Sequence, residues 1–126
     1  MFLMDFKRLA ALFAALWWLA ITWLSTRGGV PLPGFSLLQT DKLAHAAAYA
    51  LLVFLCLSSL KSVSNRHYFL FFLLAFCYGA IMEWVQYRFF PNRFYELDDM
   101  LANGIGAAAS ILVFHFWKSR KSKLEL

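Results

Sequence analysis

Four long apolar runs, separated by short polar stretches, divide the chain. A helix that crosses the roughly 30 Å hydrocarbon core of a bilayer needs about 20 apolar residues, and the runs approach this length. Backbone N–H and C=O groups without partners are very costly in hydrocarbon, so each run must be helical. The pattern therefore predicts four transmembrane helices, near residues 8–25, 42–60, 67–90 and 99–118.

Glycine, proline and basic residues mark the connections between the runs. The stretch from Arg27 to Thr40 contains several glycines and prolines, which favour a loop, and a short basic turn covers Lys61 to His67. Pro91 ends the third helix. Several runs are slightly short for a full span, and flanking aromatic and basic side chains can extend them. The charged tail from Lys118 to Leu126 is expected to be frayed.

The first run resembles a signal peptide, because Lys7 and Arg8 precede it. Tryptophans at Trp17, Trp18 and Trp23 and the lack of a small-x-small cleavage pattern after the run do not fit that alternative. We therefore interpret residues 8–25 as a retained membrane span.

The composition agrees with a membrane protein. Of the 126 residues, 62% are hydrophobic and 15% are charged, whereas soluble domains are about 45–50% apolar and about 25% charged. A soluble chain of this length could not bury so much apolar surface. We predict an all-α integral membrane bundle that forms one domain over residues 1–126. Cys56 and Cys77 lie inside apolar runs and are interpreted as small hydrophobic residues without a disulfide framework.

The net charge of +5 would suggest nucleic-acid binding in a soluble protein, but here the basic residues flank apolar runs. In that position they set topology and contact lipid headgroups, so we expect no nucleic-acid partner. If the N-terminus is cytoplasmic, eight lysines and arginines fall in inner segments and four in outer ones. This asymmetry predicts a multi-pass protein of the cell membrane with both termini in the cytoplasm.

Several ionisable and polar side chains lie near the predicted outer ends of three helices. Such groups are costly in a membrane and usually face the bundle interior or a wet cavity. Helical spacing puts them on one face of each helix, and small residues would let these faces approach closely. The residues on these faces are Asp41, His45 and Tyr49 on the second helix, Gly79, Glu83 and Gln86 on the third, and Asp99, Asn103, Gly106 and Ser110 on the fourth.

Each polar residue also has a purely structural interpretation. Asp41 and Asp99 lie at predicted helix starts, where a carboxylate can cap free N–H groups and meet the positive end of the helix dipole. Glu83 fits a structural role least well, because a carboxylate about two turns from its helix end needs a partner or a proton. Packing, interhelical or lipid-anchoring roles are open to four further residues: His45, Gln86, Arg93 and Asn103.

Three short blocks between Asp41 and Gly106 follow the patterns D-K-x-x-H, G-x-x-x-E-x-x-Q and R-x-x-x-x-x-D-x-x-x-N-x-x-G, in that order. Together these blocks resemble the VanZ-like family. The resemblance implies a small bacterial membrane protein with several helices. The family takes its name from a member associated with low-level resistance to teicoplanin, a glycopeptide that targets cell-wall precursors. Asp98 is an additional acid beside the matched Asp99. The motif residues carry over to Asp41, Lys42, His45, Glu83, Gln86, Arg93, Asp99 and Asn103.

These features lead to one main functional hypothesis. The protein binds or acts on an anionic membrane lipid or a lipid-linked cell-wall precursor at the outer leaflet, and the resemblance implies a link to glycopeptide resistance. Lys42 and Arg93 would hold a phosphate group. The predicted catalytic residues are His45, Glu83 and Asp99, and the predicted substrate-binding residues are Asp41, Lys42, Gln86, Arg93 and Asn103.

Three alternatives stay open. The polar residues could form a buried network that specifies helix packing and performs no chemistry. A metal site would use oxygen ligands and one imidazole, which suit Mn²⁺ or Mg²⁺, but no compact ligand motif supports it, and we expect no metal and no cofactor. A proton or ion pathway is disfavoured because the inner halves of the helices are apolar. The residues of the alternative metal site are Asp41, His45, Glu83 and Asp99.

Overall fold

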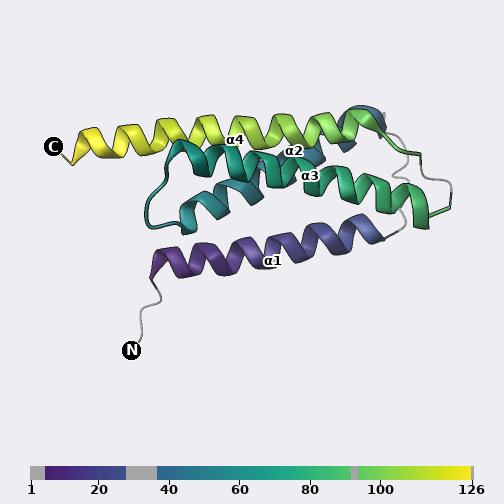
Figure 1. Cartoon of the computed structure of the whole chain (residues 1–126), viewed down its shortest axis with the longest axis horizontal. Coiled ribbons are helices and arrows are strands. Elements are labelled where there is room, and N and C mark those ends of the chain that lie inside the picture. The colour runs from purple at the N-terminus through teal and green to yellow at the C-terminus, as the bar shows by residue number, and fades with distance from the viewer. Residues whose placement is uncertain (1–4, 28–36, 92–93, 126) are drawn as a thin grey trace.

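The computed structural model describes residues 5–27, 37–91 and 94–125, and for residues 37–41 the backbone only. All four of its helices are long and apolar enough to cross a membrane, which confirms the predicted all-α bundle of membrane helices. The described residues include no strand. The helices, which alternate in direction (Figure 1), are α1 (Phe6–Thr26), α2 (Leu37–Ser59), α3 (Asn65–Phe89) and α4 (Leu97–Leu124).

The helix ends differ from the predicted ones mainly in two places. α2 begins at Leu37, several residues before the predicted start, and α4 continues to Leu124. The expectation of a frayed tail after Lys118 is therefore wrong. Lysine, arginine and leucine have high helix propensity, and basic side chains are favourable at the negative C-terminal end of a helix. Lys121 and Glu125 add an ion pair of 4.0 Å between successive turns.

Local hydrogen bonds account for two of the helix starts. At the start of α1, the backbone N–H of Lys7 donates to Oδ1 of Asp5 at 3.4 Å. Before α3, the backbone N–H of Ser64 donates to Nδ1 of His67 at 3.0 Å. These bonds provide partners for N–H groups that have none within the helix. α3 ends at Phe89, two residues before Pro91, as the sequence predicts.

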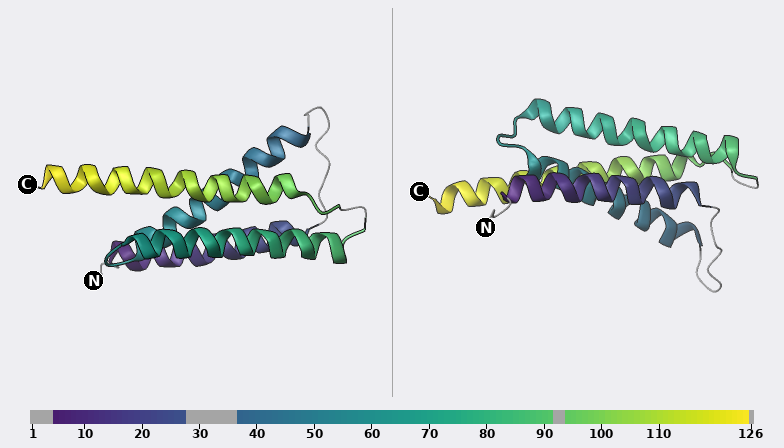
Figure 2. Two further views of the ribbon diagram at one scale, coloured as in Figure 1. Left: turned by 45° about the horizontal axis from the view of Figure 1, so that its top comes forward. Right: turned by 90° about the horizontal axis from the view of Figure 1, so that it is seen from below.

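α2 contacts all three other helices. It packs most extensively against α4, then against α1, and least against α3. α3 packs mainly on α4, whereas α1 contacts α2 and α3 and, within the described ranges, makes no contact with α4. Figure 2 shows that α2 crosses α4 obliquely. The bundle is therefore built on a crossed α2–α4 pair, with α3 and α1 packed on its sides.

The surface and interior have the opposite polarity to those of a soluble protein. Large apolar side chains on all four helices point outward, among them Leu19 and Ile105, which are 55% and 67% exposed. Carboxylate and amide side chains, by contrast, are buried between the helices. Hydrocarbon is a favourable surrounding for the outward apolar groups and an unfavourable one for the polar groups. This arrangement fits a bundle surrounded by lipid.

The close approach of α2 and α4 depends on Gly106. A Cβ atom built on this glycine would overlap the backbone of Ala46, lying 2.7 Å from its carbonyl carbon and 2.8 Å from its Cα. Side chains larger than hydrogen would therefore force the two backbones apart. The contact lies one turn from Asn103 on α4 and next to His45 on α2. Gly106 thus brings the polar faces of these helices together.

α1 begins, α2 ends, α3 begins and α4 ends at the same end of the bundle (Figure 1). The opposite end holds the start of α4 and the end of α3, which carry most of the buried polar residues. The polar residues of three helices therefore share one depth, as the sequence predicts. Which end faces the cytoplasm stays a prediction from the charge distribution.

Candidate functional site

Five polar side chains meet between α2, α3 and α4. We call this group the polar cluster. Glu83, Asp99 and Asn103 are buried, whereas Lys42 and His45 are partly exposed. Its members are Lys42, His45, Glu83, Asp99 and Asn103.

Asp99 is the centre of the polar cluster. Its side chain is only 4% exposed. Lys42 Nζ lies 3.4 Å from Asp99 Oδ1, and His45 Nε2 lies 3.6 Å from Asp99 Oδ2. The Lys42 ammonium also lies 3.8 Å from a carboxylate oxygen of Glu96 at the exposed rim. Asp99 therefore joins α4 to α2 through both of its carboxylate oxygens, while neighbouring Asp98 is exposed.

Asn103 contacts the His45 imidazole at the ring nitrogen that does not face Asp99. Its Oδ1 atom lies 3.1 Å from Nδ1 of His45, and the residue is 1% exposed. The amide nitrogen faces α3, where a Cβ atom built on Gly79 would lie 2.6 Å from it. A larger residue at this position would require the Asn103 side chain to shift. The sequence prediction that Gly79 permits a close approach of α3 and α4 agrees with this contact.

Glu83 brings α3 into the polar cluster. Glu83 is 3% exposed, and its carboxylate interacts with the backbone N–H of Glu96 at the start of α4. A carboxylate oxygen of Glu83, a ring nitrogen of His45 and a carboxylate oxygen of Asp99 all lie within 4.8 Å of one another. Three helices therefore each supply one electron-pair donor to a small buried volume.

Gln86 takes a different partner from the rest of the predicted site. Its Nε2 donates to the backbone carbonyl of Ser25 at 2.8 Å. That carbonyl belongs to the last turn of α1, where C=O groups lack partners within the helix. The bond ties α3 to the end of α1. A role for Gln86 in substrate binding stays a prediction.

Two predicted site residues lie outside what the structure describes. Arg93 falls in the gap between residues 91 and 94, and the side chain of Asp41 is not described. The backbone does place Asp41 inside α2, which begins at Leu37, so the alternative interpretation of Asp41 as a helix cap is wrong. Asp99 lies in the first turn of α4, after the N-cap residue Glu96. A favourable interaction with the helix dipole therefore applies to Asp99, in addition to its contacts with α2.

Sequence reasoning did not name Glu96 as a site residue. This residue contacts Lys42 through its carboxylate and Glu83 through its backbone. Its position one turn before Asp99 could have indicated the same helix face. The contact depends on where α4 begins, and apolar periodicity does not locate a helix end to the residue.

A groove between α1 and α2 adjoins the polar cluster and was not predicted. One part has a volume of about 490 Å³ and is lined by His45 and Gln86 at its polar end and by apolar residues such as Ile21 elsewhere. A second part of about 340 Å³ shares Trp17 and Leu51 with the first and is otherwise lined by apolar side chains. We call the two parts together the α1–α2 groove. Trp17 Nε1 donates to the carbonyl of Ala48 at 2.8 Å and holds the two helices together beside it.

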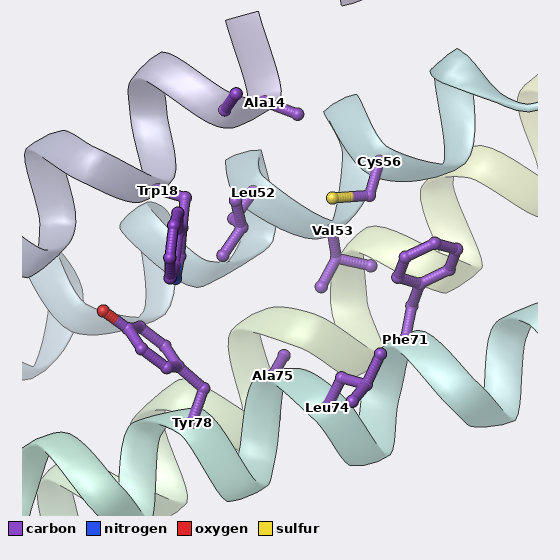
Figure 3. A pocket seen from close by; sticks show the side chains of 10 residues that line it. Ala14, Trp18, Leu52, Val53, Cys56, Phe71, Leu74, Ala75 and Tyr78 are labelled. Carbon is purple, nitrogen blue, oxygen red and sulfur yellow. The ribbon is translucent and has the colours of Figure 1, made fainter. Parts of the chain in front are cut away.

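A separate apolar pocket of about 400 Å³ lies among α1, α2 and α3. Figure 3 shows Trp18 and Tyr78 at one end of it and Cys56 and Phe71 towards the other. The Tyr78 hydroxyl is hydrogen-bonded to Thr22 of α1. Its lining carries no ionisable group other than the phenol and the thiol, so this pocket has no counterpart to the polar cluster.

Comparison with known proteins agrees with the resemblance in the sequence. The family model VanZ/LLP1 matches residues 1–118, which is nearly the whole chain. No curated protein and no solved structure matches significantly. The match spans all three sequence blocks and the helices that carry the polar cluster. This multi-pass membrane protein therefore belongs to the VanZ/LLP1 family.

Proposed function

We propose that the protein binds an anionic, phosphate-bearing lipid of the cell envelope, or a lipid-linked wall precursor, and acts on it through the polar cluster. The single observation that carries this proposal is the α1–α2 groove, whose polar end is formed by two residues of the predicted site, His45 and Gln86. The predicted topology puts this end at the extracytoplasmic surface of a bacterial cell membrane.

The shape and lining of the groove suit an amphipathic ligand. Its apolar part runs along Trp17 and Leu51 on neighbouring helices, where a lipid chain would replace bilayer lipid at little cost. A headgroup would then lie beside His45, within reach of the partly exposed Lys42 ammonium. Phosphate binds well to lysine and arginine, and Arg93 is the further predicted contact.

His45 and Glu83 are the groups suited to proton transfer. The His45 ring is oriented by Asn103 on one side and by Asp99 on the other. An imidazole held between a carboxylate and an amide is a common arrangement for a general base or acid. Glu83 offers a second carboxyl group within 4.8 Å. These groups support acid–base chemistry at a headgroup bond, such as phosphoester hydrolysis or transfer.

The proposal is tested by blocking the groove. Leu51 lines both of its parts, so a Leu51→Trp substitution would fill the space for a lipid chain. Native mass spectrometry of the detergent-solubilised protein would measure retention of a polyprenyl phosphate and of the uncharged polyprenol. We expect the phosphate to be retained preferentially, and Leu51→Trp to weaken its binding about tenfold, equivalent to about 1.4 kcal/mol.

The matched control is Leu112→Trp, which adds the same bulk on the lipid-facing side of α4, a helix that does not line the groove. This variant should bind the polyprenyl phosphate like the wild type. Equal retention of phosphate and polyprenol, or equal losses in both tryptophan variants, would contradict the proposal.

A second candidate function is a non-catalytic module in which the polar cluster specifies helix packing. The observation that favours it is the tight fit of the Asn103 amide against Gly79. On this alternative, His45→Ala and Glu83→Gln lower thermal stability in detergent and leave polyprenyl phosphate binding unchanged. The main proposal instead predicts that at least one of them changes lipid binding or cellular sensitivity to a glycopeptide while the protein stays folded.

A further inference from the structure

Three electron-pair donors converge in the buried part of the polar cluster. They are a ring nitrogen of His45 and one carboxylate oxygen each of Glu83 and Asp99, all within 4.8 Å of one another. His45 Nε2 and Asp99 Oδ2 are 3.6 Å apart. Ligand atoms about 2.0–2.2 Å from a shared metal ion lie roughly 3 to 4.4 Å from each other. A small adjustment of the side chains would therefore bring all three into coordination distance.

The hydrogen bond to Asn103 determines which ring nitrogen of His45 faces the carboxylates. The Asn103 amide nitrogen points to Gly79, so its oxygen faces Nδ1 of His45 at 3.1 Å. An amide oxygen only accepts, so Nδ1 carries the hydrogen, and Nε2 is the ring nitrogen on the side of Asp99. Metal-bound histidines typically donate their other ring N–H to an oxygen acceptor in this way.

Among the described residues, carboxylates outnumber ammonium groups around these donors. The one ammonium that the described part of the chain places within ion-pair distance of them is that of Lys42. It lies on Asp99 Oδ1 and towards Glu96, whereas His45 contacts Asp99 Oδ2. Asp99 Oδ2, a Glu83 carboxylate oxygen and a ring nitrogen of His45 thus lie close together at membrane depth. Carboxylates that are buried at this depth are favourable only beside a proton or a cation.

We infer that His45, Glu83 and Asp99 bind a divalent metal ion. One imidazole and two carboxylates suit a first-row ion such as Mn²⁺ better than Ca²⁺, which prefers oxygen ligands alone. Three protein ligands leave coordination positions open for water or a ligand. Because His45 also lines the α1–α2 groove, those positions lie near its polar end.

The metal site also extends the proposed function, and this part of the inference rests on it. The described carboxylates of the polar cluster and its rim outnumber its lysine, so alone they would repel a phosphate. A divalent ion would offset that charge and offer its open positions to phosphate oxygens. In the metal-bound protein, His45 and Glu83 would serve as ligands in place of the proton-transfer role proposed above. The substrate class is therefore a phosphate- or pyrophosphate-bearing lipid that binds through the metal.

Metal binding is tested with Mn²⁺ on protein purified in detergent in the presence of a chelator and then freed of it. Isothermal titration should show one Mn²⁺ per chain, and pulsed electron paramagnetic resonance should show coupling of the ion to a directly bound ¹⁴N nucleus. His45→Ala should abolish the nitrogen coupling and weaken Mn²⁺ binding at least about tenfold. Asn103→Ser keeps all three ligands and should weaken binding about 10-fold or more.

The matched control is Asp98→Asn, which removes an exposed carboxylate next to Asp99 that is not one of the three ligands. It should bind Mn²⁺ like the wild type and keep the nitrogen coupling. Binding of Mn²⁺ to the wild type without nitrogen coupling, or a loss in Asp98→Asn as large as in His45→Ala, would overturn the inference. A wild-type protein that binds no Mn²⁺ would overturn it too and indicate a proton between the donors.

Polyprenyl phosphate binding with Mn²⁺ and with a chelator separates the two proposals. Retention of the lipid that requires Mn²⁺ supports both. The protein could instead show the nitrogen coupling and retain the same amount of lipid with the chelator as with Mn²⁺. That result would rule out a lipid bound through the metal but would leave the metal site in place. Lipid retention in a protein without Mn²⁺ binding overturns the metal site and leaves the proposed function in place.

Discussion

At the residue scale, Asp99 and Asn103 connect α4 to the other helices through different neighbours. Asp99 contacts Lys42 and His45 on α2. Asn103, one turn further along, contacts the same imidazole and fits against Gly79 on α3. Because both residues are almost fully buried, neither could lose its partner without leaving a polar group unpaired at membrane depth.

The fit of Asn103 against Gly79 gives a prediction for the pair. Gly79→Ala would put a methyl group 2.6 Å from the Asn103 amide nitrogen. We expect the substitution to lower the free energy of unfolding by about 1–3 kcal/mol, because overpacking displaces the amide from His45. Asn103→Ala removes the clashing group. The double variant should therefore lose less stability than the sum of the losses in the two single variants. Thermal unfolding in detergent would measure all three.

The test depends on the coupling free energy between the substitutions at Gly79 and Asn103. Contacting residues typically show coupling energies of about 0.5–3 kcal/mol, whereas distant sites are additive to within about 0.5 kcal/mol. Additive losses for Gly79→Ala and Asn103→Ala would contradict the packing described here. Ala80→Val, one residue further along α3 and only partly buried, is a control for added bulk in the same helix.

At the element scale, the crossing of α2 and α4 determines whether the polar cluster forms. The two helices share the most extensive contact in the bundle, and their backbones meet at Gly106 and Ala46. In a membrane, helices associate by close packing and polar contacts, since lipid and apolar side chains are equally good surroundings for one another. A small residue at the crossing therefore has more effect on assembly than additional apolar contacts elsewhere.

A substitution that separates the two helices at their crossing should disrupt the polar cluster, although the substituted residue is not a member of it. Gly106→Val would place side-chain atoms on the Ala46 carbonyl group, so α2 and α4 must move apart. We expect a stability loss of at least about 1–3 kcal/mol and weaker contact between His45 and Asn103. Thermal unfolding would report the first effect, and the ¹⁵N chemical shifts of the His45 ring the second.

Ala109→Val on the exposed side of α4 is the matched control. It adds a branched side chain to the same helix without meeting α2, so its stability should stay within about 0.5 kcal/mol of the wild type. Equal losses in the two variants would mean that helix propensity, and not the close crossing, is responsible.

At the scale of the whole molecule, the two ends of the bundle differ. One end carries the polar cluster, and the other carries the starts of α1 and α3 and the basic end of α4. Lys118 Nζ donates to the carbonyl of Val63 at 2.7 Å, and Lys7 Nζ to that of Lys61 at 3.2 Å, so basic side chains bind the α2–α3 turn at this end. Cationic groups favour the cytoplasmic side of a membrane.

This asymmetry predicts the orientation of the protein. A fluorescent reporter that folds only in the cytoplasm should be active when fused after Leu126, and a phosphatase that folds only outside should be inactive there. The expectation follows from the excess of lysine and arginine at the end of the bundle where α1 begins and α4 ends. The same two reporters inserted after Gly34, in the loop predicted from the sequence, should give the reverse result. Activity of the phosphatase after Leu126 would put the polar cluster at the cytoplasmic surface.

The sequence alone determined the four helices, their order and the polar faces of three of them, because lipid requires every apolar run to be helical and polar groups to turn inward. Only the tertiary structure decided the partners. Asp99 is buried and Asp98 is not, Gln86 binds α1, and a groove opens beside His45. Partners depend on how helices rotate and cross, which contacts such as that of Gly106 with Ala46 determine between segments far apart in the chain.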